Sequence, residues 1–351
     1  MAAPLSGPRT SRSAQAHEAG LEASGPKAPP LEVRELSTTL FTRRGTLLAV
    51  DRLSLSVAAG ETLALVGESG CGKSLSALSV MRLLPDPPAR ITGGEVRLNG
   101  RDLVALPEEA MLAVRGQEIG MIFQDPMSSL NPVATVERQI AEVLTAHKAL
   151  SRAAARAEAL RLLELVGMPD AARRLDAYPH QLSGGMCQRV MIAMAIACSP
   201  SVLIADEPTT ALDVTVQAQV LALLKRLQAE AGMAMIFITH DLGVVAEIAD
   251  RVVVMYAGRK VEEAPVDDLF ERPLHPYTAG LIAATPVPGA ERAARLADIP
   301  GMVPALGALP DGCAFAPRCP KAFERCRRER PALTEPGAGR LVACFAAERE
   351  G

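Results

Sequence analysis

The sequence has no apolar run approaching the roughly 20 residues that a membrane-spanning helix needs, so the chain is not expected to form a channel by itself. It also lacks the strong positive charge of most nucleic-acid-binding proteins. Because the formal net charge is only -3, we expect no nucleic-acid partner. Residues 1–30 lack the apolar core of a secretion signal, and their mixture of Ala, Pro, Ser and Arg predicts a disordered extension. The composition is typical of a soluble intracellular protein.

A glycine-rich loop follows a short apolar segment, Glu61 to Val66, which favours a buried strand. The loop reads Gly67-Glu68-Ser69-Gly70-Cys71-Gly72-Lys73-Ser74 and matches the pattern GxxxxGKS, and a helix-compatible run, Lys73 to Leu84, follows it. In this order the glycines let successive backbone amides face one anion, and the helix N-terminus adds its positive end. The loop predicts a nucleotide site in which Lys73 reaches the outer phosphates and Ser74 binds Mg2+. A glycine-rich turn that binds nothing is the alternative.

Two further apolar segments end in residues suited to phosphate chemistry. Val202 to Ala205 is followed by Asp206 and Glu207, and Ala234 to Thr239 is followed by His240. Phosphate ligands of open α/β folds bind at the carboxyl edge of the sheet. We therefore expect Asp206 to bind Mg2+ directly or indirectly, Glu207 to act as general base on the attacking water, and His240 to contact the γ-phosphate. The alternatives are a helix N-terminal charge for Glu207 and a structural role for His240.

The stretch Leu182-Ser183-Gly184-Gly185-Met186 lies between these two halves and is followed by Gln188 and Arg189. It precedes a predicted helix, Met191 to Ala197, so its serine hydroxyl and backbone amides would stand at a helix N-terminus, which is an anion site. An anion site separate from the glycine-rich loop is explained if it binds the γ-phosphate held by a second subunit.

Two additions to this core are predicted by the remaining pattern. Leu53 to Val57 alternates strictly and Glu95 to Leu98 ends in the turn pair Asn99-Gly100, which favours an antiparallel sheet. Ala153 to Val166 carries apolar residues on one face and stops at Gly167, which favours a helix. We expect this helix to belong to a helical subdomain at about residues 125–190.

Together these motifs resemble those of ATP-binding-cassette (ABC) ATPases. The matching motifs are the Walker A loop at Gly67 to Ser74, the Q-loop at Gln124 in Phe123-Gln124-Asp125-Pro126, the signature at Leu182 to Met186, Walker B at Val202 to Asp206 with Glu207, the D-loop Ala211-Leu212-Asp213, and the switch histidine His240. The family signature commonly has Gln where this chain has Met186, and Met is usual in the peptide-transport branch. The resemblance implies an α/β P-loop NTPase fold over residues 31–270, with a RecA-like core, an antiparallel β subdomain and a helical signature subdomain.

The resemblance also implies cofactors and a partner subunit. It implies ATP, with Mg2+ held by Ser74, Gln124 and Asp206, and a second ABC ATPase subunit that faces this one head to tail, in a heterodimer. ATP would then join the two cassettes, and hydrolysis would let them reopen. ABC ATPases stack adenine on an aromatic residue near the start of the domain. Phe41 is the candidate here because its segment has no other aromatic residue, and an ordinary core residue is the alternative.

The region after the cassette narrows the resemblance. The segments His275-Pro276-Tyr277-Thr278 and Pro310 to Cys319 are similar to the C-terminal element of dipeptide, oligopeptide and nickel importer ATPases. This implies a C-terminal extension at residues 271–351 and a chain that powers peptide import from the cytoplasmic face of the inner membrane, as a peripheral protein. The implied partners are two transmembrane permease subunits and an extracytoplasmic substrate-binding protein.

Four of the seven cysteines crowd this extension: Cys313, Cys319, Cys326 and Cys344. Disulfides are disfavoured in a reducing cytosol, so metal ligation is the stronger interpretation. The spacings include none of the short CxxC pairs of zinc ribbons and ferredoxins, and they do not select the metal. The importer resemblance implies a [4Fe-4S] cluster, with Zn2+ or four unliganded thiols as alternatives.

Two other functions compete with peptide import. An importer ATPase for another cargo, such as nickel, would have the same cassette, because the binding protein and membrane subunits choose the cargo. Soluble ABC ATPases of DNA repair or translation usually carry two cassettes or coiled-coil arms, and this chain has one cassette and no long heptad region.

Overall fold

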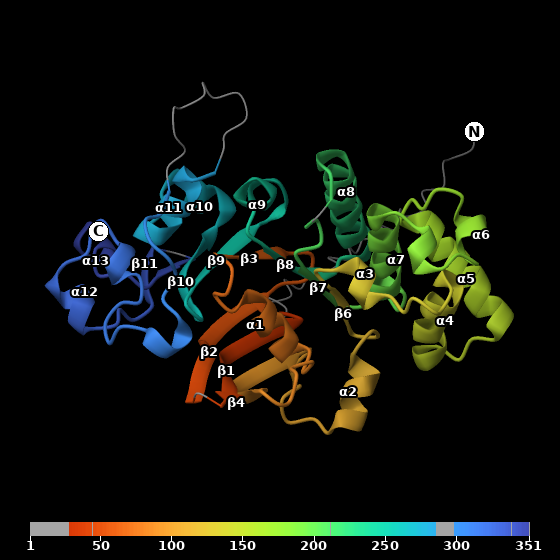
Figure 1. Cartoon of the computed structure of the whole chain (residues 1–351), viewed down its shortest axis with the longest axis horizontal. Coiled ribbons are helices and arrows are strands. Elements are labelled where there is room, and N and C mark those ends of the chain that lie inside the picture. Colours follow the sequence, from red (N-terminus) through yellow and green to blue (C-terminus); the bar gives the residue numbers. More distant parts are fainter. Residues whose placement is uncertain (1–27, 44, 211, 286–297, 338, 351) are drawn as a thin grey trace, which may run out of the picture.

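The computed structural model describes residues 28–43, 45–210, 212–285, 298–337 and 339–350. The extension predicted at residues 1–30 therefore lies almost entirely outside the described residues. Two sheets and a set of helices form the fold, with the larger sheet in the centre (Figure 1). The α/β fold with an antiparallel subdomain and a helical subdomain is confirmed.

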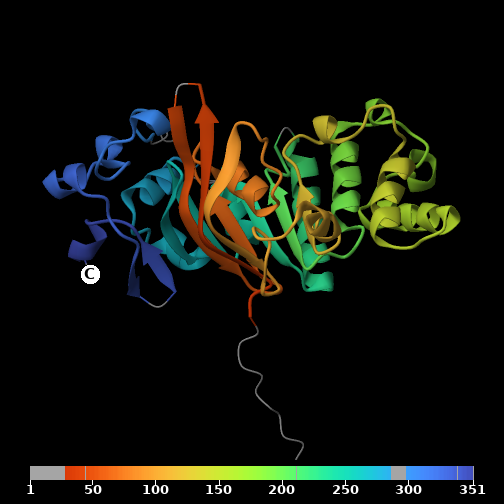
Figure 2. The ribbon, with the colours of Figure 1, turned by 90° about the horizontal axis from the view of Figure 1, so that it is seen from below.

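The smaller sheet is antiparallel, with strand order β2-β1-β4-β5. Its strands are β1 (Leu31–Thr42), β2 (Gly45–Val57), β4 (Ala89–Leu98) and β5 (Arg101–Asp102). The alternation predicted for Leu53 to Val57 is present, because Leu53, Leu55 and Val57 are buried while the intervening serines are partly exposed. Figure 2 shows this sheet lying across the middle of the molecule, between the helical region and the C-terminal tail.

The larger sheet has strand order β11-β12-β10-β9-β3-β8-β7-β6, and its strands from β9 to β6 are parallel. Their bounds are β3 (Thr62–Val66), β6 (Ile119–Ile122), β7 (Val202–Asp206), β8 (Ala234–Thr239), β9 (Arg251–Tyr256), β10 (Arg259–Pro265), β11 (Thr334–Gly337) and β12 (Arg340–Val342). The central strands β3, β7 and β8 are buried along their whole length and mostly apolar, because both faces of the sheet are covered. Leu203 and Phe237 face the helical region, whereas Ile204 and Ile236 face the antiparallel sheet.

The helices cover both faces of this sheet and extend it at one end (Figure 1). Their bounds are α1 (Lys73–Val80), α2 (Glu108–Val114), α3 (Pro126–Ser129), α4 (Val136–His147), α5 (Arg152–Leu165), α6 (Ala171–Arg174), α7 (Gly184–Ile196), α8 (Val214–Ala231), α9 (Leu242–Ile248), α10 (Val266–Glu271), α11 (Pro276–Ala283), α12 (Glu324–Arg328) and α13 (Ala347–Glu350), with 3-10 turns at Pro179–Gln181, Leu306–Ala308 and Ala316–Arg318. α3 to α7 form the helical subdomain beyond β6.

Two predicted helix boundaries were wrong. α1 ends at Val80 and not at Leu84, and Arg82 just beyond it has the left-handed φ of 52° that does not continue a helix. α7 begins at Gly184 and not at Met191, because Ser183 caps it by accepting a hydrogen bond from the backbone N–H of Met186 at 3.4 Å. The signature therefore forms the first turn of α7 itself.

The C-terminal tail is joined to the cassette by the larger sheet. β12 pairs antiparallel with β10, at Glu262↔Val342 and Glu263↔Leu341. A buried aromatic cluster of Tyr256, Tyr277 and Phe315 adds side-chain packing between β9, α11 and the tail. The domain boundary predicted between residues 270 and 271 stays a prediction, although the two parts share a sheet and a hydrophobic cluster.

Candidate nucleotide-binding site

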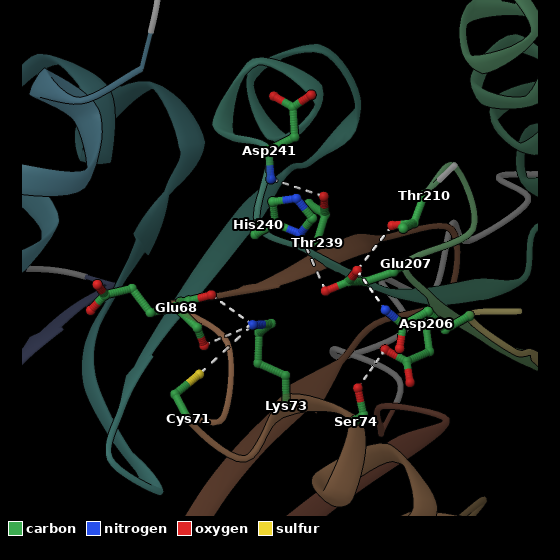
Figure 3. A network of polar contacts seen from close by, with 12 residues as sticks. Glu68, Cys71, Lys73, Ser74, Asp206, Glu207, Thr210, Thr239, His240 and Asp241 are labelled. Carbon is green, nitrogen blue, oxygen red and sulfur yellow. Dashed lines mark hydrogen bonds and ion pairs between the residues drawn. The ribbon is translucent and has the colours of Figure 1, made fainter. Parts of the chain in front are cut away.

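The Walker A loop connects the end of β3 to the start of α1, as the sequence predicts. Lys73 folds back over the loop, and its Nζ donates to the carbonyl oxygens of Gly67 at 2.6 Å and Glu68 at 3.1 Å (Figure 3). No acidic residue belongs to the first turn of α1, every residue of which the structure describes. Loop amides and a helix N-terminus provide a positive site for phosphate.

Two glycines of the loop are required by the backbone that packs against them. A Cβ atom at Gly67 would lie 2.3 Å from the carbonyl oxygen of Met255, and one at Gly72 would lie 2.8 Å from that of Ala49. Their φ angles of +150° and +100° are also unfavourable for residues with a Cβ. β9 and β2 therefore fix the course of the loop.

Ser74 and Asp206, both predicted to bind Mg2+, lie side by side. The Ser74 hydroxyl donates to Asp206 Oδ1 at 3.0 Å (Figure 3). Asp206 is the last residue of β7, which places its carboxylate at the edge of the parallel sheet. Burial raises the pKa of this carboxyl above its usual value, and the hydrogen bond from Ser74 acts against that rise. Oxygen ligands in this arrangement suit Mg2+.

Glu207 is the centre of a polar network at the same edge. Its Oε2 accepts hydrogen bonds from Gln124 Nε2 at 3.0 Å and Thr210 Oγ1 at 2.9 Å, and its Oε1 lies 3.3 Å from His240 Nδ1. Its φ of 46° is uncommon for a residue with a side chain, and such conformations cluster at functional sites. The structure thus brings together Gln124, Glu207 and His240, as expected, and adds Thr210, which sequence reasoning missed.

The signature and D-loop residues belong to the starts of two helices. Leu182 packs against the hydrophobic core of the helical subdomain, whereas a Cβ atom at Gly184 would meet no atom within 4 Å. Gly185 packs against α8, since a Cβ there would lie 2.8 Å from Val216 Cγ1. Asp213 caps α8 by accepting a hydrogen bond from the Val216 N–H at 3.0 Å. Ala211 of the D-loop lies outside the described residues.

Phe41 is at the exposed end of the β1–β2 hairpin, paired with Thr46. Its side chain is 48 % exposed, so it is not an ordinary core residue in this structure. Its proposed contact with adenine stays a prediction.

A groove lies between the sheet core and the helical subdomain, next to the Q-loop. Its volume is about 520 Å³, and its walls combine apolar side chains such as Met121, Phe123 and Met191 with the charged Arg115 and Glu142. Two exposed apolar residues, Met127 and Val133, stand in the segment between the Q-loop and α4.

The four tail cysteines line one small cavity, together with Phe315 and Phe345. Burial raises the pKa of three of the thiols, those of Cys313, Cys319 and Cys344, and brings that of Cys319 to about 11. Among the described residues, no three His, Cys, Asp or Glu side chains are grouped tightly enough to hold a metal ion.

Two tail residues contact the Walker A loop, and sequence reasoning assigned neither of them a role there. The Glu68 N–H donates to the Tyr277 hydroxyl at 2.8 Å, and the Glu68 carboxylate pairs with Arg318 at 2.7 Å. Residues 68 and 318 are 250 positions apart, so no spacing rule relates them. The motifs that contain Tyr277 and Arg318 were noticed, but only as a resemblance.

Comparison with known proteins identifies the family. The ABC transporter family matches residues 50–210, and the C-terminal region of oligopeptide/dipeptide transporters matches residues 261–326. The chain is 54% identical over 323 residues to a probable peptide ABC transporter ATP-binding protein of Sinorhizobium fredii, covering 92% of this chain and 96% of that protein. The chain belongs to the ATP-binding subunits of peptide ABC transporters.

Other similar proteins agree with this ABC ATPase assignment. The oligopeptide transport ATP-binding protein AppD of Bacillus subtilis is 51% identical over 321 residues, covering 92% of this chain and 98% of that protein. OppD of Salmonella typhimurium, also named an oligopeptide transport ATP-binding protein, is 51% identical over 328 residues, covering 93% and 97%. The dimeric cassette MJ0796, bound to ADP and phosphate, has a TM-score of 0.61 and 28% identity, covering 67% of this ABC ATPase and 98% of that chain.

The ABC ATPase contains no helix, in the parts that the structure describes, that is long and apolar enough to cross a membrane.

Proposed function

We propose that this ABC ATPase hydrolyses ATP to power the import of di- and oligopeptides through separate membrane permease subunits. The observation that carries the proposal is the placement of Gln124, Glu207 and His240 beside the Ser74–Asp206 pair, at the sheet edge next to the Walker A loop. Peptide cargo is supported by the names of the relatives and by the match of residues 261–326 to the peptide-transporter C-terminal region.

The residues around the loop divide the chemistry among them. Lys73 would exchange its two carbonyl partners for phosphate oxygens, while Ser74, Asp206 and Gln124 would hold Mg2+, which supplies positive charge at the phosphates when bound. Glu207 would accept a proton from the attacking water, and its hydrogen bonds from Gln124 and Thr210 orient it for that role. His240, which lies next to the other oxygen of the Glu207 carboxylate, would contact the γ-phosphate.

The signature residues would act on the nucleotide of a second cassette. α7 presents Ser183 and Gly184 at its N-terminus, in the helical subdomain, whereas α1 and the Walker A loop lie in the sheet core (Figure 1). A helix N-terminus with an open glycine can receive a phosphate that a partner subunit carries. The dimeric state of the cassette MJ0796 is consistent with this pairing. We propose a heterodimer with another ABC ATPase.

The groove beside the Q-loop is the proposed contact with the permeases. It adjoins Gln124, so a membrane subunit seated there would be mechanically close to the residue that touches Glu207. Its apolar and charged lining suits an amphipathic helix. In this assembly the ATPase would be peripheral on the cytoplasmic face of the inner membrane, with two permeases and an extracytoplasmic binding protein as further subunits.

A [4Fe-4S] cluster is the proposed occupant of the cysteine cavity, with Zn2+ as the alternative. Four thiols from separate turns of the tail and an apolar lining fit a cluster held by four thiolates. A single Zn2+ would need four sulfurs at about 2.3 Å from one ion. In the described residues the cysteines are not grouped tightly enough for a metal ion, so either occupant would require them to draw closer together. The cluster would cross-link the tail, and its positive iron would favour the thiolate form of thiols whose pKa burial raises.

Purification of the full chain from membranes tests the transport function. Two permeases and a second cassette should co-purify, and peptide-loaded binding protein should stimulate ATP hydrolysis in reconstituted vesicles. Lys73→Ala should abolish ATP binding and hydrolysis. Stimulation by nickel-loaded rather than peptide-loaded binding protein would show that the cargo is nickel and not peptide. A chain that associates with no membrane subunit would contradict the transport function altogether.

Metal analysis of anaerobically purified full chain tests the cofactor. Iron and acid-labile sulfide in equal amounts, with broad visible absorbance, are expected, and Cys→Ser at any of the four positions should remove them. Zinc without sulfide would replace the cluster by the alternative, and no metal would leave four free thiols.

A further inference from the structure

The side chain of Glu68, in the Walker A loop, points toward the tail. Figure 3 shows its carboxylate directed away from Lys73 Nζ, while its backbone carbonyl accepts from that lysine. The carboxylate receives two hydrogen bonds from Arg318, at 2.7 Å to Oε2 and 3.0 Å to Oε1. A planar guanidinium paired with both carboxylate oxygens fixes direction as well as distance.

Arg318 is itself held firmly. Its side chain is only 4 % exposed, and it also donates from Nε to the carbonyl oxygen of Pro300 at 2.9 Å and from Nη2 to that of Ile299 at 3.2 Å. The guanidinium also lies 5.9 Å from the ring centre of Tyr256 and 6.0 Å from that of Phe315. The arginine therefore has little freedom to follow Glu68 if the loop moves, so the pair constrains the loop.

Tyr277 constrains the main chain at the same residue. Its side chain is fully buried, and its hydroxyl accepts the Glu68 N–H at 2.8 Å. The start of α11 holds Tyr277 in place: His275 caps this helix by accepting the Tyr277 N–H on Nδ1 at 3.0 Å. Burial lowers the pKa of His275 to about 3, which keeps its ring neutral and able to accept. Tail residues thus hold both the backbone and the side chain of Glu68.

We propose that Arg318 and Tyr277 are positioning residues for the ATP site, which hold the Glu68 segment of the Walker A loop in its phosphate-binding conformation and so set the affinity for ATP. The inference rests on the proposed role of this loop in binding the phosphates. Neither residue touches the reacting atoms. A loop held in advance loses less conformational freedom when ATP binds, so their removal should weaken binding and leave the chemical step at saturating ATP nearly unchanged.

A double-mutant cycle in the full chain, assembled with its partner subunits, tests the proposal. Arg318→Ala and Glu68→Ala should each raise KM for ATP about tenfold, with kcat within about twofold of the parent, because each removes one partner of a charge-assisted bond. The double variant should be no worse than either single variant, and Arg318→Lys should recover part of the loss. Arg328→Ala, which removes an exposed tail arginine paired with Glu324, is the control and should change nothing.

Additive effects, or a KM that responds to Arg318→Ala but not to Glu68→Ala, would mean that Arg318 only stabilises the tail and would overturn the proposal. If Arg318→Ala does not fold, the variants Arg318→Lys and Tyr277→Phe test the proposal in its place. Each should raise KM by a few-fold at unchanged kcat, and an unchanged KM in both would overturn it. Equilibrium binding of Mg-ATP to the isolated full chain supplies a second readout. Lys73→Ala, measured alongside, separates this inference from the proposed function, which fails if that variant still binds and hydrolyses ATP.

Discussion

The two sides of the Walker A loop differ in how their contacts are made. On the catalytic side, Glu207 bonds to the exposed His240, whose side chain is 62 % exposed, and Lys73 bonds to loop carbonyls that ATP would displace. On the tail side, Arg318 and Tyr277 are buried and fully engaged before any ligand arrives. Lys73 is itself buried, so the two sides differ less in burial than in how long their contacts last. Lys73 would exchange its partners when ATP binds, whereas Arg318 and Tyr277 only hold the loop.

The largest expected effect is on the catalytic side. Glu207→Gln preserves size but removes the proposed general base, so steady ATP turnover of the complex should fall about a hundredfold or more while ATP binding persists. A closed dimer should accumulate. Phosphate release by the reconstituted complex measures the change, with Glu247→Gln on the exposed face of α9 as control. Turnover within a few-fold of the parent would remove Glu207 from this role.

A change in the signature should come next. Gly184→Asp places a carboxylate where the partner's phosphate would dock, and complex ATPase should fall about tenfold or more. Because a Cβ at Gly184 meets no neighbouring atom and a carboxylate at a helix N-terminus is favourable, the fold should be unaffected. Gly185 is unsuitable for this test because a side chain there would collide with Val216 and disturb the fold. If the isolated chain loses affinity for ATP, the signature does not act on the partner's nucleotide.

Cysteine substitutions sharpen the comparison on the tail side. Cys319→Ser and Cys344→Ser should both remove the proposed cluster, but only Cys319 adjoins Arg318. We therefore expect KM for ATP to rise about threefold for Cys319→Ser and to stay within about 1.5-fold for Cys344→Ser, with transport weakened in both. Iron content and steady-state kinetics on the same preparations measure this. Equal shifts in KM would show that the tail responds as a whole.

A small effect is expected at Tyr256. Its hydroxyl accepts from Arg318 Nη1 at 3.4 Å, which is long for a hydrogen bond, and Tyr256→Phe keeps the aromatic packing with Tyr277. KM for ATP should change less than about twofold. A rise as large as that for Arg318→Ala would make Tyr256 the main anchor of the guanidinium.

The two sides of the Walker A loop also differ in how far the sequence predicts them. The catalytic side was predictable because Asp206, Glu207 and His240 each directly follow an apolar strand, and parallel strands bring their ends to one edge. The structure places β6, β7 and β8 side by side, which brings residues 124, 207 and 240 to that edge. The part of Gln124 was implied only by the family resemblance. Thr210 was missed because a hydroxyl one turn beyond a strand carries no distinctive pattern.

The tail side was not predictable, because its contacts depend on tertiary packing between distant segments. Tyr277 and Glu68 meet because α11 packs near the end of β3, and Arg318 reaches Glu68 because the tail packs on the same hydrophobic cluster. The left-handed backbone of Glu207 was equally hidden, since nothing in the residue type indicates it.

The pairing of β12 with β10 has a consequence for association between molecules. Without β12, β10 would present unpaired backbone groups beside the buried carboxylate of Glu262. Open strands of this kind template edge-to-edge pairing. The strand that takes the outer position instead is β11, which is four residues long and in which Glu335 and Pro336 are both exposed. A charge and a residue without an N–H at the last strand discourage further pairing. A cassette cut off after α11 would therefore be expected to self-associate through β10.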